Sequence, residues 1–320
     1  MLKCYNYNLA IRFASDFKYP ISVFTEPEFE YELNLYEPFY GCLTKWNNLI
    51  DNIEKYYDGN PDVFVSKYYD ARENIIQSVL NSEEYKAFNS IKMPQVQKLD
   101  TVSTKSGYNH EFVGKHFISI DMKNANFQVL QLNNVINPKL SYKQFIDKYA
   151  EGFLAEYIAE SKYSRQVIFG KLNPSRQITF EKYFMSKFYQ EVVANVISDA
   201  VIAYNGSDEI ILIYDGTLSD KQKQDIATSA PFNVSINDYI LYGYEFFTIK
   251  PDSTEHKIGE FFKRSCDEDG KYKSIPLQYH KILIKKLHGL PVEDMDKIIM
   301  YDKCRVMILD DIIIKQIENN

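Results

Sequence analysis

The stretch HFISID, residues 116–121, sets the expected fold, because an apolar run of strand length ends there in one carboxylate, Asp121. A second apolar run, EIILI at 209–213, begins with an acid of its own and directly follows Asp208. Both runs are rich in isoleucine, which favours buried strands, and a turn-forming NGS sequence at 205–207 precedes the second one. The two runs therefore predict two buried strands with acidic residues at their ends.

The flanking regions are predicted to be mainly helical. Apolar residues recur three and four apart between 26 and 90, and a polar run at 97–109 separates this part from the first strand. A third strand is expected at 239–249, and the residues after about 255 have a mixed, mostly helical pattern. We therefore expect an α+β protein with a helical region at 1–109, an antiparallel-sheet domain carrying a helical insert at 110–255, and a small, mostly helical region at 256–320.

Asp121, Asp208 and Glu209 are the candidate catalytic and metal-binding residues. Phosphoryl transfer needs divalent cations that neutralise charge on the attacking and leaving oxygens, and Mg²⁺ or Mn²⁺ prefers carboxylate oxygens. Two or three carboxylates on rigid strand ends suffice for such a site. The alternative is structural: Asp121 would cap the following helix, and residues 205–208 would form an ordinary hairpin turn.

Two short sequences around these acids resemble motifs of palm-domain nucleotidyltransferases. DMKNANFQV at 121–129 is similar to the first palm motif of reverse transcriptases, in which a metal-binding aspartate precedes a small and then an aromatic stretch. YNGSDEI at 204–210 is similar to the acidic turn of tRNA-His guanylyltransferases and GGDEF-type diguanylate cyclases. The resemblance implies a palm-like antiparallel sheet, one or two Mg²⁺ (or Mn²⁺) ions on the three carboxylates, and a sugar-sensing position at Asn126 or Phe127.

This chain departs from those patterns in two respects. The second acid of the turn is Glu209, where reverse transcriptases have a second aspartate. The interval from Asp121 to Asp208 is also longer than in the cyclases and guanylyltransferases. Asp215 follows the second apolar run at its far end, and we interpret it as a turn residue.

The segment between the two acidic motifs is basic, although the protein as a whole is acidic. Residues 161–190 contain six Lys and Arg and one acid, Glu181. Arg165, Lys171 and Arg176 are the candidate nucleotide- and phosphate-binding residues of this insert, because arginine binds phosphate through two hydrogen bonds and polymerases hold the incoming nucleotide with this segment. The alternative is a set of solvated helix faces.

Composition limits the partners. The net charge of −7 argues against a protein that coats nucleic acid nonspecifically, but it allows a local basic groove. Lysines between 271 and 286 would form such a groove in a polymerase thumb, or else a solvated basic helix.

No stretch is apolar enough for a membrane span and the N-terminus lacks an apolar signal core, which predicts a cytoplasmic protein without membrane contact. Abundant Asn, Lys and Ile indicate an AT-rich genome such as that of a phage or virus.

These observations predict a metal-dependent nucleotidyltransferase. The first expectation is a polymerase that uses a 3′-hydroxyl to attack the α-phosphate of a nucleoside triphosphate on a DNA or RNA template. A nucleotide cyclase or a guanylyltransferase-like enzyme with the same metal ions is the second. A noncatalytic phage or viral binding protein, with purely structural acidic turns, is the third.

Overall fold

The computed structural model describes residues 5–23, 25–249, 256–267, 271–301, 304–307 and 311–318. The chain forms two compact units. Unit 1 contains residues 1–66, 108–114 and 241–320, and unit 2 contains residues 67–107 and 115–240. Each unit is therefore assembled from segments that are distant in the sequence, a division that differs from the three consecutive regions expected from the sequence.

Unit 2 contains an antiparallel sheet with the strand order β2-β3-β1-β4, in which β4 contributes its first half. Between β1 and β2 the chain forms a run of helices, and α12 connects β3 to β4. This βαββαβ order, with the first strand between the third and fourth, is the split βαβ arrangement of ferredoxin-like sheets. The strands and the last helix are β1 (His116–Met122), β2 (Val201–Asn205), β3 (Glu209–Ile213), β4 (Val234–Ile249) and α12 (Asp220–Ser229).

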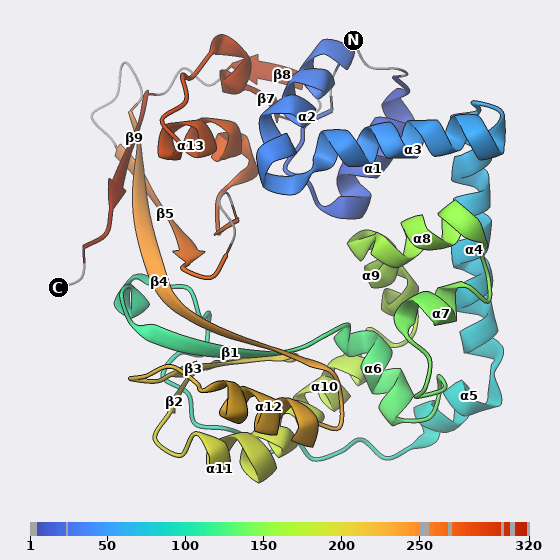
Figure 1. Ribbon diagram of the computed structural model, residues 1–320, viewed down its shortest axis with the longest axis vertical. Helices are drawn as coiled ribbons and strands as arrows, with labels where there is room; N and C mark the ends of the chain where they lie inside the picture. The colour runs from blue at the N-terminus through green and yellow to red at the C-terminus, as the bar shows by residue number, and fades with distance from the viewer. Residues whose placement is uncertain are drawn as a thin grey trace. The chain divides into compact units, whose positions relative to one another are not determined.

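Helices α10, α11 and α12 cover one face of this sheet (Figure 1). Ile118, Ile120 and Met122 alternate along β1 and point into the core beneath those helices, where Met185 and Phe188 of α10 meet them. The intervening residues of β1 point to the other face. The acidic strand ends are therefore carried by a sheet that is anchored by a packed core on its helical side.

The remaining helices of unit 2 form a separate layer beside the sheet. The C-terminal part of α4 packs against the insert, where Tyr68 of α4 and Tyr157 of α8 bring their ring centroids within 5.9 Å. The helices of this layer are α4 (Pro61–Asn81), α5 (Glu83–Ser90), α6 (Ala125–Leu132), α7 (Tyr142–Ile146), α8 (Gly152–Glu160) and α9 (Lys162–Gly170). The helical elements that cover the sheet before β2 are α10 (Pro174–Phe188), the π-helical η2 (Tyr189–Val193) and α11 (Ala194–Val196).

Unit 1 combines three N-terminal helices with a second sheet region, whose strand order is β9-β4-β5-β6. Phe246 and Phe261 from this sheet pack with Ile282 and Leu283 of α13. The elements are α1 (Tyr7–Phe17), α2 (Glu26–Tyr40), α3 (Cys42–Tyr57), η1 (His110–Phe112), β5 (His256–Arg264), β6 (Tyr272–Lys273), η3 (Leu277–Tyr279), α13 (His280–Leu287), η4 (Asp294–Lys297), β7 (Ile298–Tyr301), β8 (Cys304–Met307) and β9 (Asp311–Gln316).

The α+β class and the antiparallel sheet are confirmed, as is the helical N-terminal region. The expectation of a mostly helical C-terminal region is wrong. Among its described residues, α13 is the single α-helix, and strands β5 to β9 account for most of the rest. The runs at 298–301 and 311–316 are rich in isoleucine, whose branched side chain suits a strand, but they are too short for periodicity to distinguish strand from helix. In the described part of the chain, no helix has the length and apolar character needed to cross a membrane.

Candidate functional site

The ends of β1 and β3 bring the predicted acids together. The two strands are antiparallel neighbours, and Asp121 lies directly opposite Glu209 in their register. The amide of Met122 donates to the carbonyl oxygen of Asp208 at 2.8 Å, which fixes the turn before β3 against the end of β1. The carboxylates at the two strand ends can converge only if these strands are neighbours, and they are.

Asp121 and Glu209 share the face of the sheet that points away from the helical core, because directly paired residues lie on the same face. Ser119 is on that face too, and its hydroxyl donates to Glu209 Oε1 at 2.5 Å. Ser235 of β4 lies opposite Asp121 from the other side. The side chains on this patch are polar or acidic, and both carboxylates are half-buried.

The structural alternative for Asp121 does not hold. The residue at the N-cap of α6 is Asn124, which has a left-handed backbone conformation with φ of 52° and makes no side-chain capping hydrogen bond. Asn tolerates this conformation better than most residues do. Asp121 belongs to the strand and not to the cap, although residues 206–208 do form the link of the β2–β3 hairpin, closed by a 2.8 Å hydrogen bond from Gly206 to Glu209.

A fourth acid, Glu181, extends the group from the helical side. Glu181 lies on α10 and is buried, with its Oε1 accepting a 2.8 Å hydrogen bond from the Asn126 side chain of α6. Burial first and the negative charge of Asp208 second raise the pKa of Glu181, a hydrogen bond from Ser207 lowers it, and the net result is a pKa of about 7. No cation is among the groups that shift this pKa.

Glu181 was not among the residues expected at the site, because it was counted only as the single acid of the basic insert. One signal in the sequence could have identified it. Gln177, Glu181 and Met185 are four residues apart and share the buried face of α10, so the acid occupies a position that normally carries an apolar side chain. A carboxylate at such a position indicates either a buried ion pair or a metal-binding or catalytic site.

Of the two positions proposed for sugar sensing, Asn126 alone lies beside the acids. Phe127 is buried in an aromatic cluster with Tyr142, Phe145 and Phe169, at centroid distances of 5.4, 5.7 and 6.2 Å. Its ring therefore stabilises the insert and does not face a ligand. The two side chains differ because consecutive helical residues point in different directions, about 100° apart.

Arg176 is also a structural residue. It is buried, and its guanidinium donates to the carbonyl oxygen of Ile91 and lies over the rings of Phe88 and Phe180 at 4.9 and 5.4 Å. Arginine suits this role because its flat guanidinium stacks on aromatic rings while it donates hydrogen bonds. The expected phosphate contact of Arg176 is replaced by contacts that join α10 to the end of α5.

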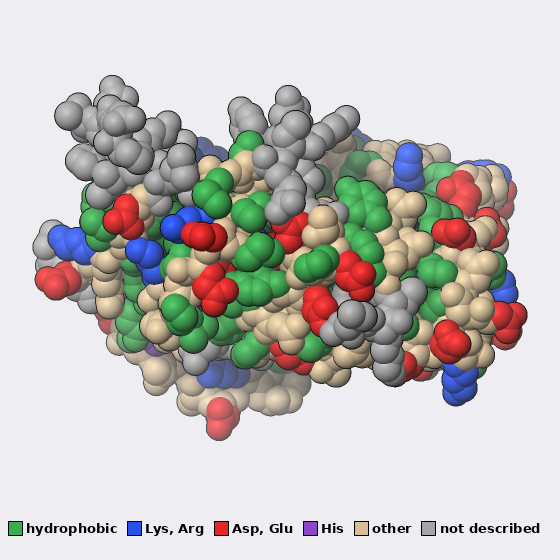
Figure 2. Space-filling view, turned by 90° about the horizontal axis from the view of Figure 1, so that it is seen from above, with side chains coloured by type: hydrophobic (Ala, Val, Ile, Leu, Met, Phe, Trp, Pro, Cys, Tyr) green, Lys and Arg blue, Asp and Glu red, His purple; other side chains and the backbone are tan. Residues whose placement is uncertain are grey.

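Arg165 and Lys171 remain accessible. Arg165 of α9 is half-buried, with its guanidinium 6.0 Å from the centre of the Tyr142 ring, and Lys171 is exposed at the C-terminus of α9. On the molecular face drawn in Figure 2, the described Lys and Arg side chains are scattered among acidic and hydrophobic ones and form no continuous basic patch.

The lysines expected in a basic C-terminal groove are partly internal. Lys281 and Lys285 of α13 are buried, and their ammonium groups pair with Glu32 and Asp296 at 2.8 Å each. Both expectations for these two lysines, a solvated helix face and a grip on duplex, are therefore wrong. An amphipathic helix can bury a lysine where a carboxylate from another element supplies the opposite charge.

The donor set at the β1–β3 end consists of carboxylate oxygens, which are the ligands that Mg²⁺ and Mn²⁺ prefer. In the conformation described, the ligand atoms of the acids at this end do not gather within 4.8 Å of one another, whereas those of a different group in unit 1 do. The Ser119 hydroxyl holds Glu209 in its present rotamer.

Comparison with protein-family models and with curated protein sequences finds no match for this chain.

The raised pKa of Glu181 predicts a stability that depends on pH. The carboxyl has a pKa of about 7 when folded and 4.5 in the reference state, so the folded chain binds more protons between these values. The free energy of unfolding therefore falls as pH rises through that window, by roughly 3 kcal/mol. Glu181→Gln keeps the acceptor for Asn126 and removes the charge, so it should stabilise the protein at pH 8 and not at pH 4.

Urea unfolding of the two proteins across this pH range measures the effect. Glu191→Gln, at an exposed glutamate of the π-helical segment η2 that follows α10, is the control and should leave the pH profile unchanged. Excess Mg²⁺ should flatten the wild-type profile, because a bound cation favours the ionised carboxylate. Equal pH profiles for wild type and Glu181→Gln would contradict the buried, charge-coupled environment described for Glu181.

Proposed function

We propose that this protein is a metal-dependent nucleotidyltransferase, with a nucleic-acid polymerase as the leading form. The observation that carries the proposal is the direct pairing of Asp121 with Glu209 across β1 and β3, with the Asp208 turn hydrogen-bonded to the end of β1. Two adjacent strands thus carry three carboxylates at one end of a sheet anchored by a packed core. Such rigid placement suits a site that must hold metal ions at fixed separation.

The donor chemistry of these residues, which are all carboxylates, suits a hard divalent cation. Asp208 and Glu181 are close enough for the charge of one to raise the pKa of the other, and a cation between such groups would remove that cost. When bound, Mg²⁺ or Mn²⁺ would supply Lewis-acid stabilisation of the triphosphate and of the attacking hydroxyl. Asp121, Asp208 and Glu209 would be its ligands, while Glu181 would complete the negative field from α10.

The remaining roles belong to neighbouring groups. The N-terminus of α6 begins four residues after Asp121 and has no side-chain cap, so its amides would donate hydrogen bonds to phosphate oxygens. Arg165 and Lys171 remain the candidates for longer-range contact with the triphosphate. Asn126, held by Glu181, would contact the sugar, where the amide could hydrogen-bond a hydroxyl. The ligands of this proposal are a nucleoside triphosphate and, for a polymerase, a DNA or RNA primer and template.

The test is nucleotide incorporation by the full chain. A labelled primer on a template is incubated with a mixture of ribo- or deoxyribonucleotides and Mg²⁺ or Mn²⁺, and a parallel reaction without primer is analysed for cyclic or linear dinucleotides and for cyclic mononucleotides. We expect primer extension that EDTA abolishes. Cyclic products would replace the polymerase with the cyclase form of the proposal, and the absence of every metal-dependent nucleotide product would overturn it.

A further inference from the structure

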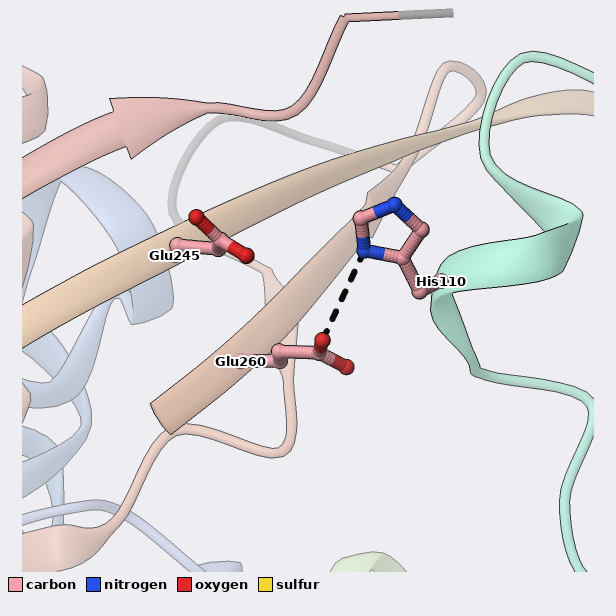
Figure 3. A group of neighbouring side chains, drawn as sticks. All are labelled: His110, Glu245 and Glu260. Atoms are coloured by element: carbon pink, nitrogen blue, oxygen red, sulfur yellow. Dashed lines mark ion pairs between the residues drawn. The ribbon is translucent and has the colours of Figure 1, made fainter. Parts of the chain in front are cut away.

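A second group of ligands lies in unit 1, whereas the acids at the strand ends belong to unit 2. His110 of η1, Glu245 of β4 and Glu260 of β5 each offer a ligand atom, and these atoms all lie within 4.8 Å of one another. Figure 3 shows the three side chains turned toward a common point, with His110 Nδ1 3.6 Å from Glu260 Oε1. Because the three residues come from separate elements, their convergence depends on the fold of unit 1 and not on local sequence.

The two glutamates create a charge that needs a counter-charge. Glu245 and Glu260 are direct partners across β4 and β5, and like charges opposite each other destabilise an antiparallel pair. Lys315 of β9 is the register partner of Glu245 on its other edge, so one exposed ammonium faces the row of two carboxylates. A divalent cation shared by both glutamates and the imidazole would balance this row more completely.

The segment that carries His110 is built to lie close to these strands. Gly243 is two residues before Glu245 and therefore shares its face of β4, and a Cβ there would come within 2.5 Å of a Val113 methyl carbon. The amide of Gly114 donates to Leu241 at 2.8 Å, and the Tyr108 ring lies 6.4 Å from that of Phe262. Glycine at 243 thus lets residues 108–114 approach β4 and holds His110 over the glutamates.

An open space adjoins the group. A cavity of about 280 Å³ is lined by His110, Glu245, Lys315 and Glu318, among others. Three protein ligands with room for a water or substrate at a fourth position are the pattern of zinc sites that remain open to ligands. The imidazole distinguishes this group from the all-carboxylate set in unit 2 and favours Zn²⁺ over Mg²⁺ or Ca²⁺.

We infer that His110, Glu245 and Glu260 form a divalent transition-metal site, with Zn²⁺ as its first candidate. The bound ion would connect residues 108–114 to the β4–β5 pair, since His110 is 135 positions from Glu245 (245 − 110) and 150 positions from Glu260 (260 − 110) in the sequence. Metal bridges between distant residues restrict the unfolded chain and stabilise the folded one. The inference stands apart from the proposed nucleotidyl transfer.

The test is Zn²⁺ binding by the full chain, measured by equilibrium dialysis or calorimetry with Zn²⁺ as the single added metal. Asp121→Asn together with Asp208→Asn forms the background, so that the acids of unit 2 do not contribute. We expect one bound Zn²⁺, an affinity reduced at least about tenfold by His110→Ala or by Glu260→Gln, and a higher melting temperature with Zn²⁺. Glu111→Gln, an exposed acid of the same short helix, is the matched control and should bind as the background does.

Two results would overturn the inference: no Zn²⁺ bound by the background protein, or the same stoichiometry and affinity in His110→Ala. The His110 and Glu260 side chains are 52% and 39% exposed, so their replacement removes no core packing. Circular dichroism of each variant without metal checks that point. If Glu260→Gln alone is misfolded, His110→Ala decides the result.

Discussion

For the proposed nucleotidyltransferase, Asp208→Asn is expected to reduce nucleotide incorporation by about 10³-fold, because loss of one proposed metal ligand would remove about 4 kcal/mol of transition-state stabilisation. Asp208 ends the turn before β3, and its backbone carbonyl holds the end of β1. Asparagine keeps that backbone and the size of the side chain, so the fold should persist. The measurement is kcat for primer extension at saturating Mg²⁺, with unfolding by urea as the check on stability.

Asp215→Asn is the matched control for this substitution. Asp215 is exposed and follows the opposite end of the same strand, so its replacement should leave kcat unchanged. Asp121→Asn should match Asp208→Asn in effect, because the two residues lie at the same end of adjacent strands. Full activity in either Asp121→Asn or Asp208→Asn would show that the acids are structural.

Lys281→Met should lower the free energy of unfolding by about 3–5 kcal/mol, because it leaves the carboxylate of Glu32 buried without its partner. The Lys281 ammonium lies 2.8 Å from Glu32 Oε1 and also donates to the carbonyl oxygens of Met295 and Ile298 at 3.2 and 3.0 Å. Methionine retains most of the volume but donates no hydrogen bond. Urea unfolding at neutral pH, monitored by circular dichroism, measures the loss.

A double variant separates the buried charge from the loss of packing. Replacing Glu32 with Gln in the Lys281→Met protein removes the unpaired charge while retaining an acceptor for the Ser22 amide, which now donates to Glu32 at 2.7 Å. We expect the double variant to recover more than half of the lost stability. A loss below about 1 kcal/mol in Lys281→Met would contradict this prediction, because a loss of that size is typical of a surface ion pair.

Strands β1 and β3 and most of β4 could be predicted because their signals are local, whereas β2 was missed within a segment expected to be helical. A run such as HFISID has the length and isoleucine content of a buried strand, and NGS before the second run marks a turn. The strands β1 and β3 formed at these positions, and the acids took their places at the strand ends. The short C-terminal strands β7 to β9 were missed, because segments of four to six residues carry too little periodicity to distinguish a strand from a helix.

The candidate site was predicted in part, and its errors share a cause. Arg176 and Phe127 have the side chains that a nucleotide would require, yet both are buried in contacts with elements distant in the sequence. Glu181 has an ordinary side chain in a basic segment, yet α10 brings it to Asn126 and near Asp208. Residue type states what chemistry a side chain could perform, while burial and partners depend on which elements pack together.

The sequence by itself determined that two isoleucine-rich strands end in carboxylates, because strand propensity and turn chemistry act over a few neighbouring residues. Only the tertiary structure decided that Asp121 faces Glu209, that Glu181 of the insert lies near Asp208, and that His110 meets Glu245 and Glu260. These contacts span from tens of residues to more than a hundred. They arise from the pairing of strands and the burial of helix faces, and no short stretch of sequence encodes either of these.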